Sequence, residues 1–319
     1  GRWISPQAAA KSIRSSGSSA RYLPNTRVIL MLDPRQSSSA EVDVGVIAFY
    51  HPGKNEPCDG VCQAGFLGNF AEGETLYLDG VPFRTAEGAF QATKFWPHAN
   101  RFSRLDGGEV FALKKQLEAT AYVDRTYNGY NTNWTAMREV LRAKFRPGGS
   151  FAQGLIATSD AFLIEHNSMP GRDIIWSNNH VGNGRNWLGM QLMLLRDELR
   201  GLERDRGTWT HFIRDTCQID LETGEPSFGG GAQSWNLVVK VATEQTLAHL
   251  TQIADRANPQ RKKAARVQQL CQRRPACFEP TYDGQPGYCS RTCKRLHEQE
   301  QQAFVPSWPT CMRPECFNL

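Results

Sequence analysis

The sequence lacks any hydrophobic run long enough to cross a bilayer, which takes about 20 consecutive apolar residues. Its most apolar stretch, residues 27–32, is short and is followed directly by Asp33 and Pro34. A secretory signal is also missing, because residues 1–23 are rich in Ser, Arg and Ala without an apolar segment. We therefore expect an intracellular protein, in the cytoplasm or the nucleus, with no membrane partner.

A strong charge of one sign is absent too. The formal net charge is +5 over 319 residues, and the isoelectric point is about 8.7. This falls short of the dense basic clustering that is typical of proteins held to nucleic acid by phosphate contacts. A phosphorylated or polyanionic substrate is compatible with this charge but is not required by it.

Cysteine is scarce before residue 270 and abundant after it. Six of the nine cysteines lie in that last segment, and clustering of this kind in an intracellular protein favours metal over disulfides. The spacing of Cys271, Cys277, Cys289 and Cys293 suits a tetrahedral zinc site, in which His297 could replace one cysteine. Disulfides or free thiols are the alternatives.

Composition divides the chain into four parts. Residues 265–319 have too few aliphatic side chains to fold by burial alone, so zinc would hold this module together. Residues 311–319 repeat the start of the module, which predicts a truncated second copy. We expect the module to bind a protein or nucleic-acid partner. The predicted parts are a flexible leader (1–23), a main domain (24–204), an extension of its core or linker (205–264) and the Cys-rich module (265–319).

The fold expected for the main domain is mainly α with a small antiparallel β element. Residues 26–32 and 42–50 are rich in Val and Ile and read as strands, and residues 74–85 read as a hairpin that turns at Asp79-Gly80. Residues 234–256 suggest a strand passing into a helix. Apolar periodicity predicts the remaining helices, over residues 85–96, 108–122, 133–146, 150–159 and 186–204.

The helix expected over residues 85–96 carries Glu87 and Lys94 among aromatic and small residues. Residues seven apart share a helix face but lie roughly 10 Å apart along the axis, so the two charges should not pair directly. A helix that is apolar nearly all round is buried. Desolvation would then lower the pKa of Lys94 and make its amine a nucleophile. A solvated surface pair is the simpler alternative.

A second set of polar side chains lies in residues 171–189. Asp173 and Trp176 precede the segment Gly184-Arg185-Asn186, where Asn186 could cap the following helix and Arg185 could bind an anion. Trp176 offers a face for stacking a base. The alternative is a Gly/Asn-rich turn without a ligand, with Asp173 as a loop cap.

These stretches occur in one order that resembles the NADAR (YbiA-like) family. The matching motifs begin with Gly68-Asn69-Phe70 and continue through residues 86–95, 133–145, 155–167 and 173–196. Ser177 stands where the family has glycine, and Gly68 where it has serine. The resemblance covers roughly residues 46–200 and implies a YbiA-like fold.

The resemblance implies an N-glycosidase that needs no cofactor for catalysis. Two substrate types are associated with the family, namely ADP-ribose attached to guanine in nucleic acid and ribosylamino-pyrimidine phosphates of riboflavin biosynthesis. In both, ribose C1 carries an exocyclic amine, so the sugar can open to an imine that a lysine attacks to form a Schiff base. A domain that only binds ADP-ribose is the third hypothesis.

Under this resemblance Lys94 is the expected nucleophile. Glu87 would orient the ribose hydroxyls or move protons, and Asp173 would be an acid or base. The expected substrate-binding residues are Asn69, Phe70, Trp176, Gly184, Arg185, Asn186 and Glu165.

Overall fold

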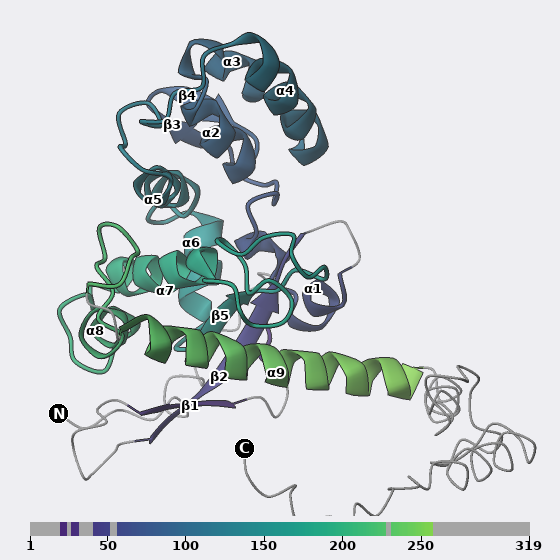
Figure 1. Cartoon of the computed structure of the whole chain (residues 1–319), viewed down its shortest axis with the longest axis vertical. Coiled ribbons are helices and arrows are strands. Elements are labelled where there is room, and N and C mark those ends of the chain that lie inside the picture. The colour runs from purple at the N-terminus through teal and green to yellow at the C-terminus, as the bar shows by residue number, and fades with distance from the viewer. Residues whose placement is uncertain (1–19, 24–26, 32–40, 52–55, 228–230, 258–319) are drawn as a thin grey trace, which may run out of the picture. The chain divides into compact units, whose positions relative to one another are not determined.

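The Val- and Ile-rich segments near the N-terminus form adjacent strands, as their composition predicts. In the computed structural model of the protein, β1 (Arg27–Met31) pairs antiparallel with β2 (Glu41–Phe49). The structure describes residues 20–23, 27–31, 41–51, 56–227 and 231–257 (Figure 1). The chain divides into two units, residues 1–250 and 251–319. The cysteines of the expected zinc site lie outside the described residues.

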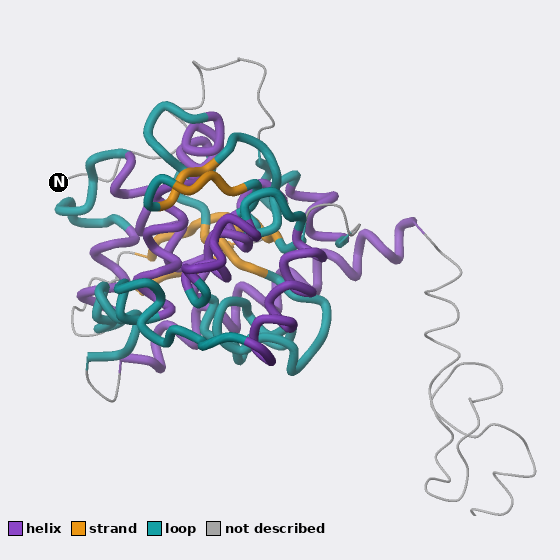
Figure 2. Tube along the Cα trace, turned by 90° about the horizontal axis from the view of Figure 1, so that it is seen from above, coloured by secondary structure: helices purple, strands orange, loops and turns teal. Residues whose placement is uncertain are grey.

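The β element is not purely antiparallel, which corrects part of the expected fold class. Strand β5 (Phe162–Glu165) runs parallel to β2, with Phe49 opposite Glu165, and the sheet order is β1-β2-β5. All four β5 residues are buried, so this strand has no alternation of polar and apolar residues that would reveal it in the sequence. Figure 2 shows the strands lying among the helices and loops.

The hairpin predicted over residues 74–85 is confirmed. Strands β3 (Leu76–Leu78) and β4 (Val81–Phe83) pair antiparallel across Asp79 and Gly80. Both turn residues have positive φ, 46° and 80°, which is the backbone geometry of a tight hairpin turn.

Each helix predicted before residue 205 is present, within a few residues of its expected bounds. The segment predicted over residues 85–96 ends earlier than expected, since Trp96 precedes Pro97 and the chain passes there into a 3-10 turn. The helices are α1 (Pro57–Cys62), α2 (Ala86–Thr93), α3 (Ala99–Phe102), α4 (Gly107–Thr120), α5 (Asn133–Lys144), α6 (Ser150–Ala157), α7 (Trp187–Leu199), α8 (Trp209–His211) and α9 (Gly231–Ala257), with 3-10 turns at Gly65–Leu67 and Trp96–His98 and a π turn at Phe212–Thr216.

The strand expected at the start of residues 234–256 is wrong, because the whole segment belongs to α9. The adjacent residues Val238 and Val239 resemble a strand locally. Together with Trp235 and Ala242, however, they fall on one helical stripe that is buried in the core. None of the helices in the described part of the chain is long and apolar enough to cross a membrane.

Residues 20–23 do not belong to the flexible leader expected over residues 1–23. Leu23 is buried, and its N–H donates to the Val46 carbonyl at 2.8 Å. The Tyr22 ring packs where a side chain on Gly45 would otherwise lie. This short segment therefore adds to the core beside β2.

Helix α5 supports the turn at residues 68–70 through a buried lysine. Lys144 is 4% exposed, and its Nζ donates to the Gly68 carbonyl at 2.7 Å. Burial lowers the pKa of Lys144 to about 7, because the uncharged amine loses less solvation than the ammonium. The aromatic rings of Phe145 and Phe151 lie 4.9 and 5.2 Å from the same nitrogen.

We predict that Lys144 makes stability rise with pH. Between pH 7 and 10 the unfolded chain binds a proton at residue 144 that the folded chain does not, so raising the pH favours folding. The free energy of unfolding of the native protein should therefore increase relative to Lys144→Met by roughly 1 kcal/mol per pH unit over this range. Urea denaturation at several pH values measures the difference. The exposed control Lys115→Met should give a constant difference, and a constant difference for Lys144→Met would contradict the prediction.

Candidate functional site

The site begins where two parallel strands end side by side. Tyr50 follows β2 directly, and Glu165 is the last residue of β5. The carboxyl ends of parallel strands meet at one edge of a sheet, which is a common place for ligands. The Tyr50 and His51 N–H groups both donate to the Asp59 carboxylate at 2.9 Å, which fixes the chain as it leaves β2.

Glu165 is a buried carboxyl group without an evident counter-ion among the described residues. It is 8% exposed, and its Oε2 atom has no hydrogen-bond partner there. Burial raises the pKa of Glu165 well above its ordinary value, and the charges of Asp173, Glu87 and Asp59 raise it further. Burial and like charges therefore favour the protonated form of this carboxyl group, which can act as a proton donor.

Helix α2 supplies the reactive face. Thr85 caps it by accepting from the Gly88 N–H at 3.0 Å, and all eight residues of the helix are buried, as its composition predicts. Glu87 and Lys94 do not pair directly. Gln91 lies between them, with its Nε2 donating to Glu87 Oε1 at 2.8 Å and its Oε1 accepting from Lys94 Nζ at 2.9 Å.

Lys94 lies half-buried just after α2, against aromatic rings. Its Nζ is 4.7 Å from the centre of the Phe90 ring and 5.8 Å from that of Tyr127. The loop that carries Tyr127 is fixed to the lysine backbone, because the Asp124 N–H donates to the Lys94 carbonyl at 2.9 Å. Desolvation lowers the pKa of Lys94, and the nearby Glu87 carboxylate opposes this shift. The expectation that desolvation lowers this pKa agrees with the structure.

The loop of residues 171–189 meets α2 through Trp176. Its ring contacts the Phe90 ring edge-on at 5.5 Å, so two residues that are 86 positions apart in the sequence share one site. Asp173 Oδ1 accepts the N–H groups of Ile175 and Trp176, both at 2.9 Å. Asp173 therefore acts as a loop cap, the simpler alternative for it, and also lies near enough to raise the pKa of Glu87 and Glu165.

The turn at residues 68–70 lies against the start of α2. The Glu87 N–H donates to the Asn69 carbonyl at 2.9 Å, and the Asn69 side-chain oxygen is buried with no partner among the described residues. Phe70 stacks on His51, with ring centres 4.4 Å apart and planes at 16°. The predicted pocket-lining pair thus reaches both α2 and the end of β2.

The segment of residues 184–186 departs most from expectation. Asn186 has no side-chain bond to α7, so the expected cap is wrong. It is fully buried, and its side chain accepts from the Glu165 N–H and donates to the Leu163 carbonyl, both at 2.9 Å. A side chain so placed orients β5 and is closed to a phosphate.

Gly184 and Arg185 also have roles within the protein. A Cβ at residue 184 would lie 2.2 Å from the Ser177 carbonyl oxygen, so glycine is required there by the loop itself. Arg185 is exposed, pairs with Glu225 and lies 5.2 Å from the Trp187 ring. Of the three residues expected to meet phosphate, only Arg185 is accessible.

Three residues next to the predicted site were not assigned a role by the sequence analysis. Gln91 shares the helix face of Lys94, so helical periodicity was a signal for it. Lys144 stands in the third predicted helix, over residues 133–146, and only its contact with Gly68 in the structure reveals its supporting role. Tyr127 has a left-handed backbone, with φ of 55°, and nothing local in the sequence predicts its approach to Lys94.

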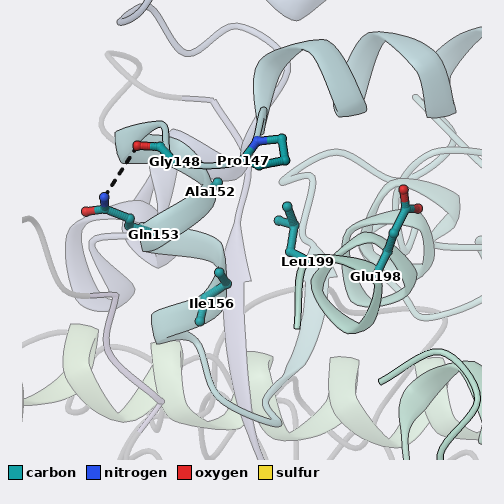
Figure 3. Close-up of a pocket in the computed structure, with 7 residues that line it drawn as sticks. All are labelled: Pro147, Gly148, Ala152, Gln153, Ile156, Glu198 and Leu199. Carbon is teal, nitrogen blue, oxygen red and sulfur yellow. Dashed lines mark hydrogen bonds between the residues drawn. The ribbon is translucent and has the colours of Figure 1, made fainter. Parts of the chain in front are cut away.

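A pocket of about 300 Å³ lies elsewhere, between α6 and the end of α7 (Figure 3). None of the predicted site residues lines it. Its walls are largely apolar, and the Glu198 carboxylate at its edge is paired with Arg142. We therefore do not assign the pocket to the site. Among the residues that the structure describes, no group of His, Cys, Asp and Glu side chains is arranged to hold a metal ion.

Chemically, the site combines an amine with a lowered pKa, acidic groups with raised pKa values and aromatic faces. Lys94 can act as a nucleophile, and Glu165 or Glu87 can give or take a proton. Tyr127 and Trp176 are partly exposed and offer apolar surface for a planar group, and both rings contact the buried Phe90 ring.

The NADAR domain model matches residues 49–200 of the chain. A riboflavin biosynthesis protein of Vibrio vulnificus is 28% identical over 205 residues, which are 63% of this chain and 49% of that protein. The chain therefore spans about half the length of that relative.

The N-glycosidase YbiA of Escherichia coli K12 is 31% identical over 140 residues, 42% of this chain and 81% of that protein. The NMR structure of E. coli YbiA, at 27% identity, covers 50% of this chain and 88% of that one, with a TM-score of 0.39. With the domain match and a relative aligned over most of its own length, the chain belongs to the NADAR family.

Proposed function

We propose that this protein is an N-glycosidase that cleaves the bond between ribose C1 and an exocyclic amine through a Schiff base on Lys94. One observation carries the proposal: the Lys94 amine, with a lowered pKa, lies against aromatic rings and close to buried carboxyl groups. The E. coli relative is named as an N-glycosidase, which agrees with the proposal.

The reaction starts with ring opening. A protonated acid donates to the ring oxygen as its bond to C1 breaks, and the exocyclic nitrogen forms an imine with C1. The neutral Lys94 amine adds to C1, and a proton passes to the exocyclic nitrogen. The base then leaves as a free amine, Lys94 stays bound to C1 as a Schiff base, and water releases the sugar.

The three carboxyl groups of the site have different surroundings, and we assign their roles on that basis. Glu165 is the better proton donor, because burial and three neighbouring carboxyl groups favour its protonated form. Asp173 is half-buried and bound to two backbone N–H groups, which suits a group that positions Trp176. Glu87 is buried beside Gln91, and in this proposal its carboxyl group binds the ribose hydroxyls.

ADP-ribose on guanine in nucleic acid is the substrate that we favour. Its support is the basic and Cys-rich C-terminal sequence, which a small metabolite would not require, although those residues lie outside the described part. A ribosylamino-pyrimidine phosphate is the second candidate, because a relative is named as a riboflavin biosynthesis protein. In both cases Trp176 would stack on the substrate, and Arg185 is the accessible cation for its phosphate.

We predict that borohydride traps the sugar on Lys94. Incubation with substrate and reductant should add the mass of the sugar moiety to the peptide that contains Lys94, because reduction makes the Schiff base permanent. Lys94→Ala should lose trapping and at least about 100-fold of the activity. Lys115→Ala, an exposed lysine on α4, is the matched control. Turnover that survives Lys94→Ala would overturn the assignment.

A second prediction separates the substrates. ADP-ribosylated guanine in an oligonucleotide should be cleaved, and the ribosylamino-pyrimidine phosphate should be cleaved more slowly or not at all. Chromatography of the released base measures both reactions. The opposite order would favour riboflavin metabolism, and binding of ADP-ribose without cleavage of either substrate would favour an inactive binding domain.

The Cys-rich module and the intracellular location are proposed from the sequence alone. We propose that Cys271, Cys277, Cys289 and Cys293 bind one zinc ion, supported by their spacing. Elemental analysis of the purified chain should find zinc, and Cys277→Ser with Cys289→Ser should remove it while the Lys94 chemistry persists. An equal zinc content in this double variant would contradict the proposal.

A further inference from the structure

Glu87 and Gln91 on one face of α2 form a continuous hydrogen-bonded row with Lys94, which directly follows the helix. Glu87 accepts from Gln91 at 2.8 Å, and Gln91 accepts from Lys94 at 2.9 Å. We propose that Gln91 is a positioning residue that keeps Lys94 from forming an ion pair with Glu87 and directs its amine toward the substrate. The part of this inference that concerns the substrate rests on the proposed function of Lys94. The separation of Lys94 from Glu87 does not depend on that function.

The direction of the Gln91 amide is fixed by its partners. When Glu87 is ionised its carboxylate only accepts hydrogen bonds, so the NH₂ end of Gln91 faces Glu87 and the oxygen faces Lys94, as the structure has them. Gln91 is 6% exposed, and little room remains for it to turn. The amide therefore presents a fixed, uncharged acceptor to the lysine.

An uncharged acceptor suits an amine that has to react. A neutral amine can donate one N–H to Gln91 Oε1, which leaves its lone pair directed away from the helix and available to C1. A carboxylate in the same place would instead favour the ammonium, which has no lone pair. Gln91 thus holds the nitrogen while favouring its charged form less than a carboxylate would.

The other groups around Lys94 shift its pKa in both directions. Glu87 and Glu118 raise its pKa, while burial and the Lys114 charge on α4 lower it. The Phe90 and Tyr127 rings add a weak attraction for the cation. Burial is the largest of these contributions and leaves the pKa of Lys94 lowered, so a new carboxylate in direct contact would shift it upward.

The test replaces Gln91 by a charged residue of the same size. Gln91→Glu places a carboxylate 2.9 Å from the present position of Lys94 Nζ. Competitive acetylation with acetic anhydride from pH 6 to 10.5, followed by mass spectrometry, gives the titration of Lys94 relative to the exposed Lys115. We expect the Lys94 inflection to move upward by about 1–3 pH units in Gln91→Glu.

Two further variants complete the comparison. Glu87→Gln removes the distant charge and should move the inflection downward, by less than Gln91→Glu moves it upward. Gln91→Met keeps the length of the side chain but makes neither hydrogen bond. It should lower turnover about 10- to 100-fold, since the amine is no longer held in place. Circular dichroism melting identifies any variant that does not fold.

The outcomes are distinct. An unchanged Lys94 inflection in Gln91→Glu, or turnover in Gln91→Met equal to that of the native protein, would overturn the role of Gln91. The labelling needs no substrate, so it stands apart from the proposed activity. If the Lys94 inflection shifts as expected but borohydride traps no sugar on the native protein, the role of Gln91 in separating the two charges is supported and the proposed function fails.

Discussion

Burial of α2 is the constraint on which the rest of the site depends. All eight residues of this helix are buried, including Glu87, and Lys94 follows immediately. Charged groups in such a place lose their hydration and must find polar partners inside the protein. Gln91 supplies that partner to both of them from the same helix. The lowered pKa of Lys94 follows first from its burial, before any effect of neighbouring charges.

The residues around the lysine separate into those that hold the site and those exposed to a ligand. Asn186, Gly184 and Lys144 bind or pack against backbone within the fold, and each fixes a loop or a strand end. Lys94 and Trp176 remain partly accessible and meet across the Phe90 ring. Support from buried side chains gives the accessible ones a defined geometry, which catalysis by proximity requires.

Local features were predictable because they depend on neighbours in the chain. Thr85 caps α2, and Asp79-Gly80 turns the hairpin, since both effects act over three or four residues. The burial of α2 followed from its composition alone. Three expectations were wrong because the features concerned depend on residues that are distant in the chain. The β2–β5 pairing joins residues about 116 apart in sequence, Asn186 bonds to a strand rather than to its own helix, and Val238-Val239 lie in a helix that the core selects.

Residue types and their order were enough to indicate a NADAR-like domain and to single out Lys94, Glu87 and Asp173 as candidates, because those motifs are continuous in the chain. The contacts between these motifs could not be predicted from any single motif. The approach of Tyr127 to Lys94, the support of Gly68 by Lys144 and the isolation of the Glu165 carboxyl all arise when distant segments pack together. Packing removes water from these groups, and the loss of water is what changes their charge and their chemistry.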